Sequence, residues 1–439
     1  MLLHLLEPFH VEPFWSIGSG TLAEVPARLR ELGGDRAILI ADSNTMPAAG
    51  EAVAARLEAA GCAVDRVILP AAEAHADDRT LKRLLERARD VIAERSVILA
   101  VGSGTLNDLG KAVAAEFARP MIILGTAPSM DGFASGTSSL TINRVKTSVK
   151  THTPDYIILD TDILSAAPLP LLWAGLGDML AKYSSLCDWR ISHIVNGEAY
   201  DPAIAALVRA AVQACGDRVE MLPKRDPAAV AAVAEGLILA GMAMTLAGVS
   251  RPASGVEHYI SHFWDMRAAA FDISADYHGL QCGVASMAVA PLYRDLRALL
   301  DTYELPEDYR PKFDREAWRR ELSDLLGVGA EPLIELDDRE QKYLPAEMAE
   351  RARTALRRRG ELQEVITAAM AGSETFIARW RQAGGPTTLA ELSVTRPRLG
   401  EVFRHTGDVR DKYVLSRLLL DLGLADNIVT RGDCLRLVI

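Results

Sequence analysis

Residues 97–113 read VILAVGSGTLNDLGKAV and pass from a β-branched apolar run, through a glycine turn, into a stretch of helical period. A strand that ends in a glycine turn and leads directly into a helix is typical of a strand-helix-strand unit. Glycine lets the backbone come close to a pyrophosphate, and the N–H groups at the start of the helix attract its charge. An ordinary tight turn has the same local sequence. The neighbouring segments must therefore show whether this is a nucleotide-binding turn or an ordinary one.

The segments around this stretch alternate in the same way. The predicted strands are 36–44, 63–70, 96–105 and 120–129. The predicted helices between them are 50–62, 79–95 and 106–118. Strands joined by helices of this length imply right-handed crossovers and a parallel sheet, with nucleotides bound at the carboxyl ends of the strands.

The pattern changes near residue 162. Beyond it nearly every segment has helical period and is broken only by Pro and Gly. We therefore predict an α/β Rossmann-like domain with a parallel sheet over residues 1–164, which binds a dinucleotide. An all-helical domain follows over residues 165–439.

The composition narrows the range of partners. The chain has 439 residues, of which 49% are hydrophobic and 24% charged, as in ordinary globular proteins. The net charge of −11 argues against a nucleic-acid or anionic-membrane partner, because most of the surface would repel it. An anionic substrate would then need a local basic pocket.

Cysteine usage and hydropathy predict a cytoplasmic protein without a membrane span. The five cysteines are odd in number and contain no CxxC pair, which fits a reducing compartment. Residues 1–14 are apolar but lack a basic leader and a small-residue cleavage site, so no secretory signal is predicted. The most apolar run, 231–250, carries Glu235 and is expected to form a buried core helix rather than a membrane helix.

Three positions in the first domain are candidates for nucleotide contact on chemical grounds. Gly102 and Gly104 belong to the glycine turn, and Asp42 ends a strand, where a carboxylate can accept the ribose hydroxyls of NAD. Residues 125–140 follow another strand and are rich in glycine and hydroxyl side chains, as expected where backbone packs against a ligand. Asp131 lies among them.

Three histidines in the second domain are candidate metal ligands. His258 and His262 are four residues apart and so share one helix face, and His278 follows closely. A hydrogen-bonded core histidine is the alternative for each, although the clustering weakens it. Asp178, among apolar residues upstream, is the candidate carboxylate, because a metal would offset its desolvation. An ion pair of Asp178 with Lys182, one helical turn later, is the other interpretation.

Five motifs, taken together and in this order, resemble the sn-glycerol-1-phosphate dehydrogenase family. That family lies within the superfamily of iron-containing alcohol dehydrogenases, glycerol dehydrogenases and dehydroquinate synthases. The resemblance covers most of the chain and is weaker beyond about residue 300. The motifs are GSGTLNDLGK (102–111), TAPSMDGFAS (126–135), GLGDMLAKYSSLCDW (175–189), SRPASGVEHYISH (250–262) and HGLQCGV (278–284).

The resemblance implies roles for individual residues. It places the ligands of one divalent metal at Asp178, His258 and His278, and the substrate contacts at Asp131, Asp178 and His262. Zinc, nickel and iron all suit such a ligand set. A fourth histidine ligand of the alcohol dehydrogenase branch is replaced here by Lys182. The implied nucleotide contacts are Asp42, Gly104, Thr105, Leu106, Asn107, Asp108, Thr126, Ser129 and Ser135.

The activity implied by the resemblance is the reversible NAD(P)H-linked reduction of dihydroxyacetone phosphate to sn-glycerol 1-phosphate. A homodimer is expected separately, because a helical domain rich in Ala and Leu can supply a dimer face. Asp42 favours NAD over NADP, because it would repel a 2′-phosphate. Two alternatives stay open, a dehydrogenase for glycerol or another polyol, and a catalytically silent nucleotide-binding protein with a structural metal. The candidates for binding the substrate phosphate are Arg144, Lys146, Lys150 and Arg251.

Overall fold

The computed structural model describes residues 2–143, 145–392 and 399–438 and divides into two compact units. Unit 1 consists of Met1–Met179 and Asp217–Gly248, and unit 2 of Leu180–Gly216 and Val249–Ile439. The units are thus interleaved along the chain. Residues 217–248, which the sequence places in the second domain, pack in unit 1. The boundary after residue 164, between a nucleotide-binding domain and a helical domain, stays a prediction.

Unit 1 contains a six-stranded parallel sheet, which confirms the predicted fold class. Its strand order is β1-β8-β5-β4-β2-β3. Four of these strands match the predicted runs, whereas the short strands β1 and β8 were not predicted. The strands are β1 Trp15–Gly18, β2 Arg36–Asp42, β3 Ala63–Leu69, β4 Ser96–Gly102, β5 Met121–Gly125 and β8 Tyr156–Asp160.

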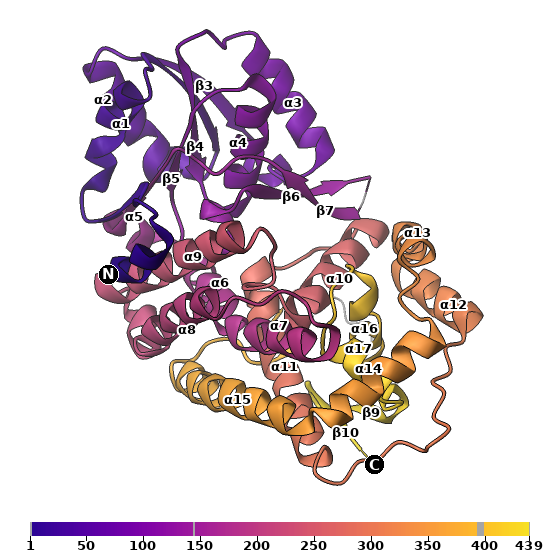
Figure 1. Ribbon diagram of the computed structural model, residues 1–439. Coiled ribbons are helices and arrows are strands. Elements are labelled where there is room, and N and C mark those ends of the chain that lie inside the picture. Colours follow the sequence, from indigo (N-terminus) through magenta and orange to yellow (C-terminus); the bar gives the residue numbers. More distant parts are fainter. Residues whose placement is uncertain (1, 144, 393–398, 439) are drawn as a thin grey trace. The chain divides into compact units, whose positions relative to one another are not determined.

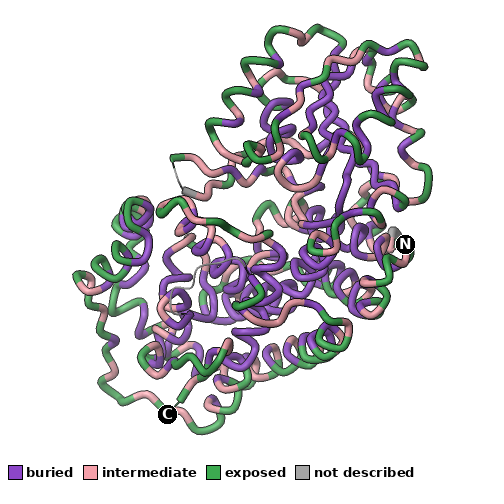
Figure 2. Tube along the Cα trace, turned by 180° about the vertical axis from the view of Figure 1, so that it is seen from behind, coloured by how far each residue is buried: buried purple, intermediate pink, exposed green. Residues whose placement is uncertain are grey.

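Helices cover both faces of this sheet (Figure 1). Leu39 and Leu99 belong to an apolar cluster that includes residues of α1 and α2. Ala100 points to the opposite face, where α4 packs so closely that a Cβ on Gly110 would lie 2.7 Å from the Ala100 Cβ. The central strands are buried along their length (Figure 2). The helices are α1 Val25–Glu31, α2 Glu51–Ala59, α3 Asp78–Arg89 and α4 Gly104–Phe117.

The rest of unit 1 is a hairpin and three further helices. The hairpin of β6 and β7 was not predicted and follows the short 3-10 helix η5. One described helix, α9, is long and apolar enough to cross a membrane by length and composition, but 72% of its most apolar window is buried. The elements are η5 Asp131–Ala134, β6 Thr137–Ile142, β7 Val145–Lys150, α5 Thr161–Ala166, α6 Leu169–Leu180, whose last residue falls in unit 2, and α9 Pro227–Ala247.

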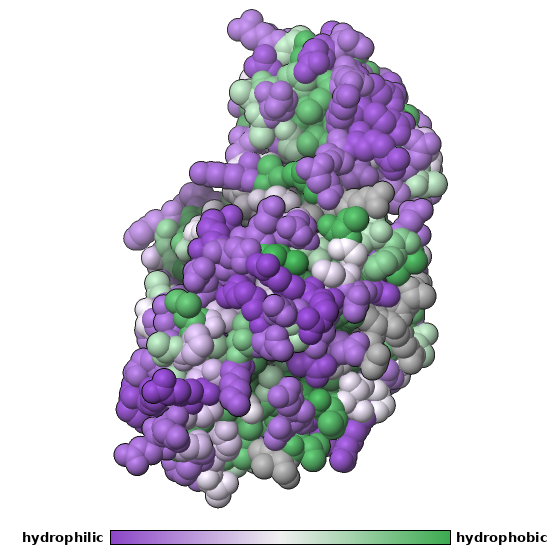
Figure 3. All heavy atoms as spheres, turned by 90° about the vertical axis from the view of Figure 1, so that its right-hand side faces the viewer, coloured by the Kyte–Doolittle hydropathy of each residue, from purple (hydrophilic) through white to green (hydrophobic). Residues whose placement is uncertain are grey.

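Unit 2 is mostly helical, as predicted, but it also contains a two-stranded antiparallel hairpin near its end that the sequence did not predict. The face of the molecule seen in Figure 3 is largely hydrophilic, in keeping with the high charge of the chain. The elements are α7 Lys182–Asn196, α8 Pro202–Gly216, α10 Val256–Phe271, α11 His278–Leu299, α12 Arg315–Leu326, α13 Glu331–Glu340, α14 Pro345–Arg357, α15 Arg359–Gln382, α16 Leu399–Arg404, α17 Leu415–Asp421, β9 Ile428–Arg431 and β10 Cys434–Leu437.

Candidate active site

The order of the strands creates a switch point between β2 and β4. The chain passes from β2 to β3 on one side of the sheet, then crosses to β4 on the other side of β2. In open α/β sheets, ligands bind outside the carboxyl ends of the strands at such a point. Asp42 is the last residue of β2 and Gly102 the last of β4, so two predicted nucleotide contacts flank it.

The Asp42 carboxylate is already engaged in its own turn. Its Oδ1 accepts hydrogen bonds from the backbone N–H groups of Asn44 and Thr45, both at 2.8 Å. The side chain is half-buried. These bonds fix the carboxylate at the end of the strand through Oδ1.

The turn after β4 depends on glycine. A Cβ on Gly102 would lie 2.4 Å from Leu106 Cδ1, and one on Gly104 would lie 3.1 Å from Met130 Cγ. The Gly102 carbonyl accepts a hydrogen bond from the Thr126 N–H at 3.0 Å, which joins this turn to the loop after β5. The tight turn therefore brings two of the predicted contact segments together.

Helix α4 presents its N-terminus at this turn. The Ser103 hydroxyl does not cap the helix, because it donates to the Ala127 carbonyl at 2.9 Å and pairs with the Ser129 hydroxyl. The amide of Asn107 donates to Asp108 Oδ1 at 3.0 Å, while its buried Oδ1 has no hydrogen-bond partner among the described residues. An uncapped helix start beside an unsatisfied acceptor fits a nucleotide with phosphate and hydroxyl groups.

Lys111, which the sequence analysis did not single out, organises the other side of the loop. Its ammonium is fully buried and donates to the carbonyls of Gly132 at 2.9 Å and Thr137 at 2.6 Å. It also donates to the Ser135 hydroxyl at 3.2 Å and lies 3.6 Å from Asp108 Oδ1. Burial raises the pKa of Asp108, against the attraction of Lys111. Asp108 and Ser135 thus take part in holding the loop.

Asp131 and Asp178 meet within unit 1. The Asp131 N–H donates to Asp178 Oδ2 at 2.9 Å, and Asp178 is completely buried. A glycine three residues earlier in α6 allows this approach, since a Cβ on Gly175 would lie 1.8 Å from the Pro128 carbonyl oxygen. Gly241 of α9 packs against the same loop, and a Cβ there would lie 2.5 Å from the Asp131 carbonyl oxygen.

The three candidate histidines come together in unit 2. The ring centroids of His258 and His278 are 5.1 Å apart, and those of His262 and His278 are 5.3 Å apart and stacked. The rings of His258 and His262 are 6.4 Å apart, as their positions on one face of α10 predict. His278 comes from the first turn of α11.

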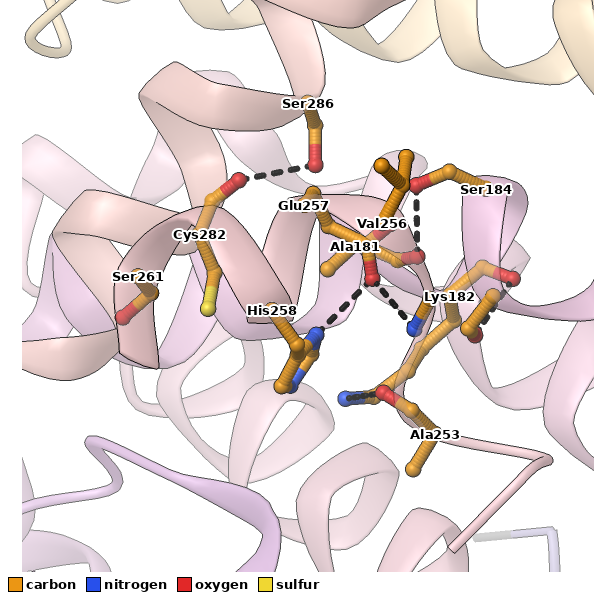
Figure 4. A network of polar contacts seen from close by, with 12 residues as sticks. Ala181, Lys182, Ser184, Ala253, Val256, Glu257, His258, Ser261, Cys282 and Ser286 are labelled. Carbon is orange, nitrogen blue, oxygen red and sulfur yellow. Dashed lines mark hydrogen bonds and ion pairs between the residues drawn. The ribbon is translucent and has the colours of Figure 1, made fainter. Parts of the chain in front are cut away.

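Hydrogen bonds orient two of these imidazoles. His258 Nδ1 lies 2.8 Å from Glu257 Oε1, and His278 Nδ1 lies 2.9 Å from the Ser261 hydroxyl, which donates to Gln281. Burial raises the pKa of Glu257, but the hydrogen bond and charge of His258, together with hydrogen bonds from Ser184 and the Gly255 N–H, outweigh it and hold that pKa below its usual range. Figure 4 shows the Glu257 carboxylate beside His258. A carboxylate or hydroxyl on Nδ1 is the usual second partner of a metal-binding histidine and assigns Nε2 to the metal.

Two groups of side chains within unit 2 are close enough to hold an ion. They are His258 with His278 and Cys282, and His262 with Asp265 and His278, and the ligand atoms within each group lie within 4.8 Å of one another. Cys282 Sγ is 3.6 Å from His278 Nε2, and its sulfur points toward the His258 side (Figure 4). Burial raises the pKa of this thiol, but the charges of His258 and His278 outweigh it and lower the pKa.

Sequence reasoning missed Glu257, Ser261, Asp265 and Cys282. Helical spacing was the available signal for three of them. Ser261 follows His258 by three residues, Asp265 follows His262 by three, and Cys282 follows His278 by four, so each shares a face with a candidate ligand.

Asp188, also missed, positions the start of α10. Its fully buried carboxylate accepts hydrogen bonds from the Val256 N–H at 2.9 Å, the Leu415 N–H at 3.1 Å and the Tyr293 hydroxyl at 2.8 Å. Burial, reinforced by Glu257, raises the pKa of Asp188 to about 7. This carboxylate joins four helices, α7, α10, α11 and α17, around the histidines.

The remaining predicted cations have different surroundings. Lys146 is half-buried and Lys150 exposed on β7, while Arg144 lies outside the described residues. Arg251 is buried and paired with Glu198. The Lys182 ammonium is also buried and donates to the Ala253 carbonyl at 3.1 Å (Figure 4).

Comparison with known proteins places the chain in a family. Residues 16–168 match the family described as iron-containing alcohol dehydrogenase. A glycerol-1-phosphate dehydrogenase (NAD(P)+) of Halalkalibacterium halodurans is 34% identical over 66% of this chain and 72% of its own length. The enzyme of that name from Bacillus licheniformis is 30% identical over 93% of this chain and 88% of its own length.

A solved structure agrees on the fold. The maleylacetate reductase of Rhizobium sp. strain MTP-10005 has a TM-score of 0.57 at 19% identity and covers 95% of this chain and 98% of its own. At that identity the likeness shows the fold alone. The relatives show more, and the chain belongs to the glycerol-1-phosphate dehydrogenase family of the iron-containing alcohol dehydrogenases.

Proposed function

We propose that the protein catalyses the reversible NAD(P)H-linked reduction of dihydroxyacetone phosphate to sn-glycerol 1-phosphate with a bound divalent metal. The family membership carries this proposal, because enzymes named for that activity match the chain over more than two thirds of their length. The clustering of His258, His262 and His278 supports it, since the sequence resemblance implies metal and substrate contacts at these residues.

The proposed metal ligands are His258 and His278 of unit 2 and Asp178 of unit 1. The histidines suit the role, because Glu257 and Ser261 hold their Nδ1 atoms and orient Nε2 for a metal. Zinc, nickel and iron fit two imidazoles and a carboxylate. A bound divalent cation acts as a Lewis acid that polarises the substrate carbonyl and stabilises the charge that develops on its oxygen.

The nucleotide is proposed to bind at the switch point of the sheet. Its pyrophosphate would lie at the start of α4, at Gly104, Thr105 and Leu106, where no side chain caps the helix. Asp42 would accept the ribose hydroxyls, and its charge favours NADH over NADPH. The unsatisfied Asn107 Oδ1 supplies an acceptor for a ligand hydroxyl or amide.

The proton and the hydride have separate sources in this scheme. A nucleotide held at the start of α4 would supply the hydride for the carbonyl carbon, and the carbonyl oxygen would take up a proton to become the new hydroxyl. We assign that proton relay to His262, because an imidazole titrates near neutrality. Asp131 and Asp178 complete the proposed substrate contacts, and the backbone of Asp131 is fixed on the Asp178 carboxylate.

Assembly and location form the last part of the proposal. We propose a homodimer, with a face supplied by helices rich in Ala and Leu. We also propose a cytoplasmic location, which the five unpaired cysteines support. Mass measurement in solution at several protein concentrations tests the dimer.

The proposed activity is tested by oxidation of NADH and NADPH with dihydroxyacetone phosphate, dihydroxyacetone and a chelated control. We expect metal-dependent turnover with the phosphorylated ketone. Turnover only with dihydroxyacetone would identify a polyol dehydrogenase instead, and tight metal binding without hydride transfer to either ketone would indicate a silent nucleotide-binding protein.

Two substitutions separate the proposed roles. His258→Ala should abolish turnover and metal retention together, because it removes a ligand. His262→Ala should slow turnover while the metal content of the purified protein stays unchanged. Equal metal loss in both variants would contradict the separation.

A further inference from the structure

Unit 2 contains a cavity of about 250 Å³ that none of the proposed catalytic residues lines. It is bounded by the end of α7, the turn before α10 and the segment that leads into α17. Its volume lies below the roughly 300–1,000 Å³ of pockets for drug-sized ligands, so the occupant must be small. The charged and hydroxyl side chains of its lining are Ser192, Glu198, Arg251, Asp411, Lys412, Tyr413 and Arg417.

Arg251 is neutralised within the cavity wall. Its Nε donates to Glu198 Oε1 at 2.7 Å, a second nitrogen pairs with Glu198 Oε2, and a third donates to the Tyr413 carbonyl at 2.8 Å. Its side chain is 2% exposed. This arrangement makes Arg251 a rigid, charge-balanced part of the wall rather than the source of the cavity's charge.

Arg417 is the first cation of the cavity that forms no ion pair with a described carboxylate. It is 8% exposed, and its terminal nitrogens donate to the backbone carbonyls of Lys342 at 3.2 Å and Asp411 at 3.4 Å. Its Nε is buried and has no hydrogen-bond partner in the described parts of the chain. The guanidinium also lies over the rings of Tyr343 and Tyr413. Two carbonyls and two rings thus hold the charge of Arg417 at the cavity wall, with no ion pair to neutralise it among the described residues.

Lys412 is the second such cation. Its ammonium is half-buried and contacts the Ser250 hydroxyl, and it forms no ion pair among the residues that the structure describes. Burial, together with Arg251 and Arg410, lowers the pKa of Lys412 to about 7. The remaining acid of the wall, Asp411, is solvent-exposed and therefore screened.

We propose that this cavity binds a small phosphate-type oxyanion, held by the Lys412 ammonium and the Arg417 guanidinium. A dianion balances two cations that form no ion pair with any residue that the structure describes, and its oxygens accept hydrogen bonds from these two side chains of the lining. In a chain with a net charge of −11, phosphate binding requires such a local concentration of donors. The occupant is inorganic phosphate or the phosphoryl group of a small metabolite.

The test is calorimetric titration of the full chain with inorganic phosphate, without nucleotide. Wild type should bind phosphate, and Lys412→Gln and Arg417→Gln should each weaken binding at least tenfold. Arg320→Gln is the matched control, because Arg320 is an exposed cation of unit 2 and should leave the affinity unchanged. Lys412→Gln keeps the test decisive if Arg417→Gln fails to fold.

Absence of phosphate binding by wild type, or equal affinity in Lys412→Gln and Arg320→Gln, would overturn the proposal. A second titration with saturating dihydroxyacetone phosphate identifies the source of the oxyanion. Displacement of phosphate that depends on Lys412 assigns the cavity to the substrate phosphoryl group, and retention of phosphate assigns it to a separate anion. Since the titrations need no turnover, failure of the proposed reductase activity would not be confused with failure of this site.

Discussion

Lys111 in unit 1 and Lys342 in unit 2 are both buried ammonium groups that hold a loop through its backbone carbonyls. Lys111 binds the carbonyls of Gly132 and Thr137, in the loop that carries Asp131. Lys342 binds the carbonyls of Gly407, Asp408 and Arg410, at 3.3, 3.3 and 2.6 Å, just before the segment that lines the proposed oxyanion cavity.

The two lysines differ in how their charge is balanced. Lys111 lies 3.6 Å from Asp108, whereas Lys342 forms no ion pair among the described residues and relies on carbonyl dipoles. Burial lowers the pKa of Lys342 to about 8, against the attraction of Asp408. Burial also lowers the pKa of Lys111, although Asp108 favours its charged form. The comparison indicates that carbonyl dipoles, without an ion pair, can hold a loop on a buried ammonium.

Lys111→Met should produce the largest effect. It removes the donors to the loop and leaves the buried Asp108 without its counter-charge, which costs about 3–5 kcal/mol. Chemical denaturation would measure the loss in the free energy of unfolding. Lys82→Met, at an exposed position of α3, is the control and should be nearly neutral. A loss no greater than that of the control would show that Lys111 does not hold the loop.

Lys342→Met should cost less, about 2–3 kcal/mol, because it leaves carbonyl groups unsatisfied but no carboxylate within ion-pair distance of the lost ammonium. The same denaturation experiment measures it. This variant should also weaken phosphate binding, since the segment before Asp411 loses its anchor. If Lys342→Met proves more destabilising than Lys111→Met, the contrast drawn from charge balance is wrong.

A double substitution tests whether the ion pair of Lys111 with Asp108 contributes to the free energy of unfolding. Adding Asp108→Asn to Lys111→Met removes the unpaired buried charge and should restore about 1–2 kcal/mol of the free energy of unfolding. Asp108→Asn alone should be destabilising, because the ammonium then loses its carboxylate. Simple additivity of the two single effects would mean that the pair at 3.6 Å contributes no coupling energy.

The smallest predicted effect is a pH dependence specific to Lys342. Its pKa falls from an ordinary 10.5 to about 8 in the folded state, so the unfolded chain binds more protons between these values. The stability of wild type relative to Lys342→Met should therefore rise by about 1 kcal/mol between pH 7.5 and 9. Denaturation curves of both proteins at these pH values measure the difference, and a fall with increasing pH would contradict the assignment.

Local patterns explain why much of the fold could be predicted. The runs that became β2, β3, β4 and β5 are apolar and continuous, and the glycine turn after β4 is visible in a few residues. The strands β1 and β8 are only four and five residues long, and they are strands because they pair in parallel with each other. Pairing between distant segments is not visible locally, although the buried apolar residues 157–159 of β8 were an available signal.

Some features of the candidate site could also be predicted from local sequence, whereas others could not. The spacing of His258 and His262 predicts a shared helix face, and the structure brings both beside His278. Glu257 is next to His258 in sequence, and successive helical residues point in different directions, so spacing alone does not predict that its carboxylate reaches Nδ1. The roles of the nucleotide and metal residues stay predictions, and the variants at His258 and His262 test two of them.

By itself, the sequence determined the alternation of strands and helices, the glycine turn, the histidine spacing and, through its motifs, the family resemblance, because these depend on residues close together in the chain. Only the tertiary structure decided which partners surround the buried charges of Lys111, Lys342 and Arg417. A buried ammonium or guanidinium is stabilised by carbonyl and carboxylate groups that converge from distant segments, and that convergence exists only after the chain has folded.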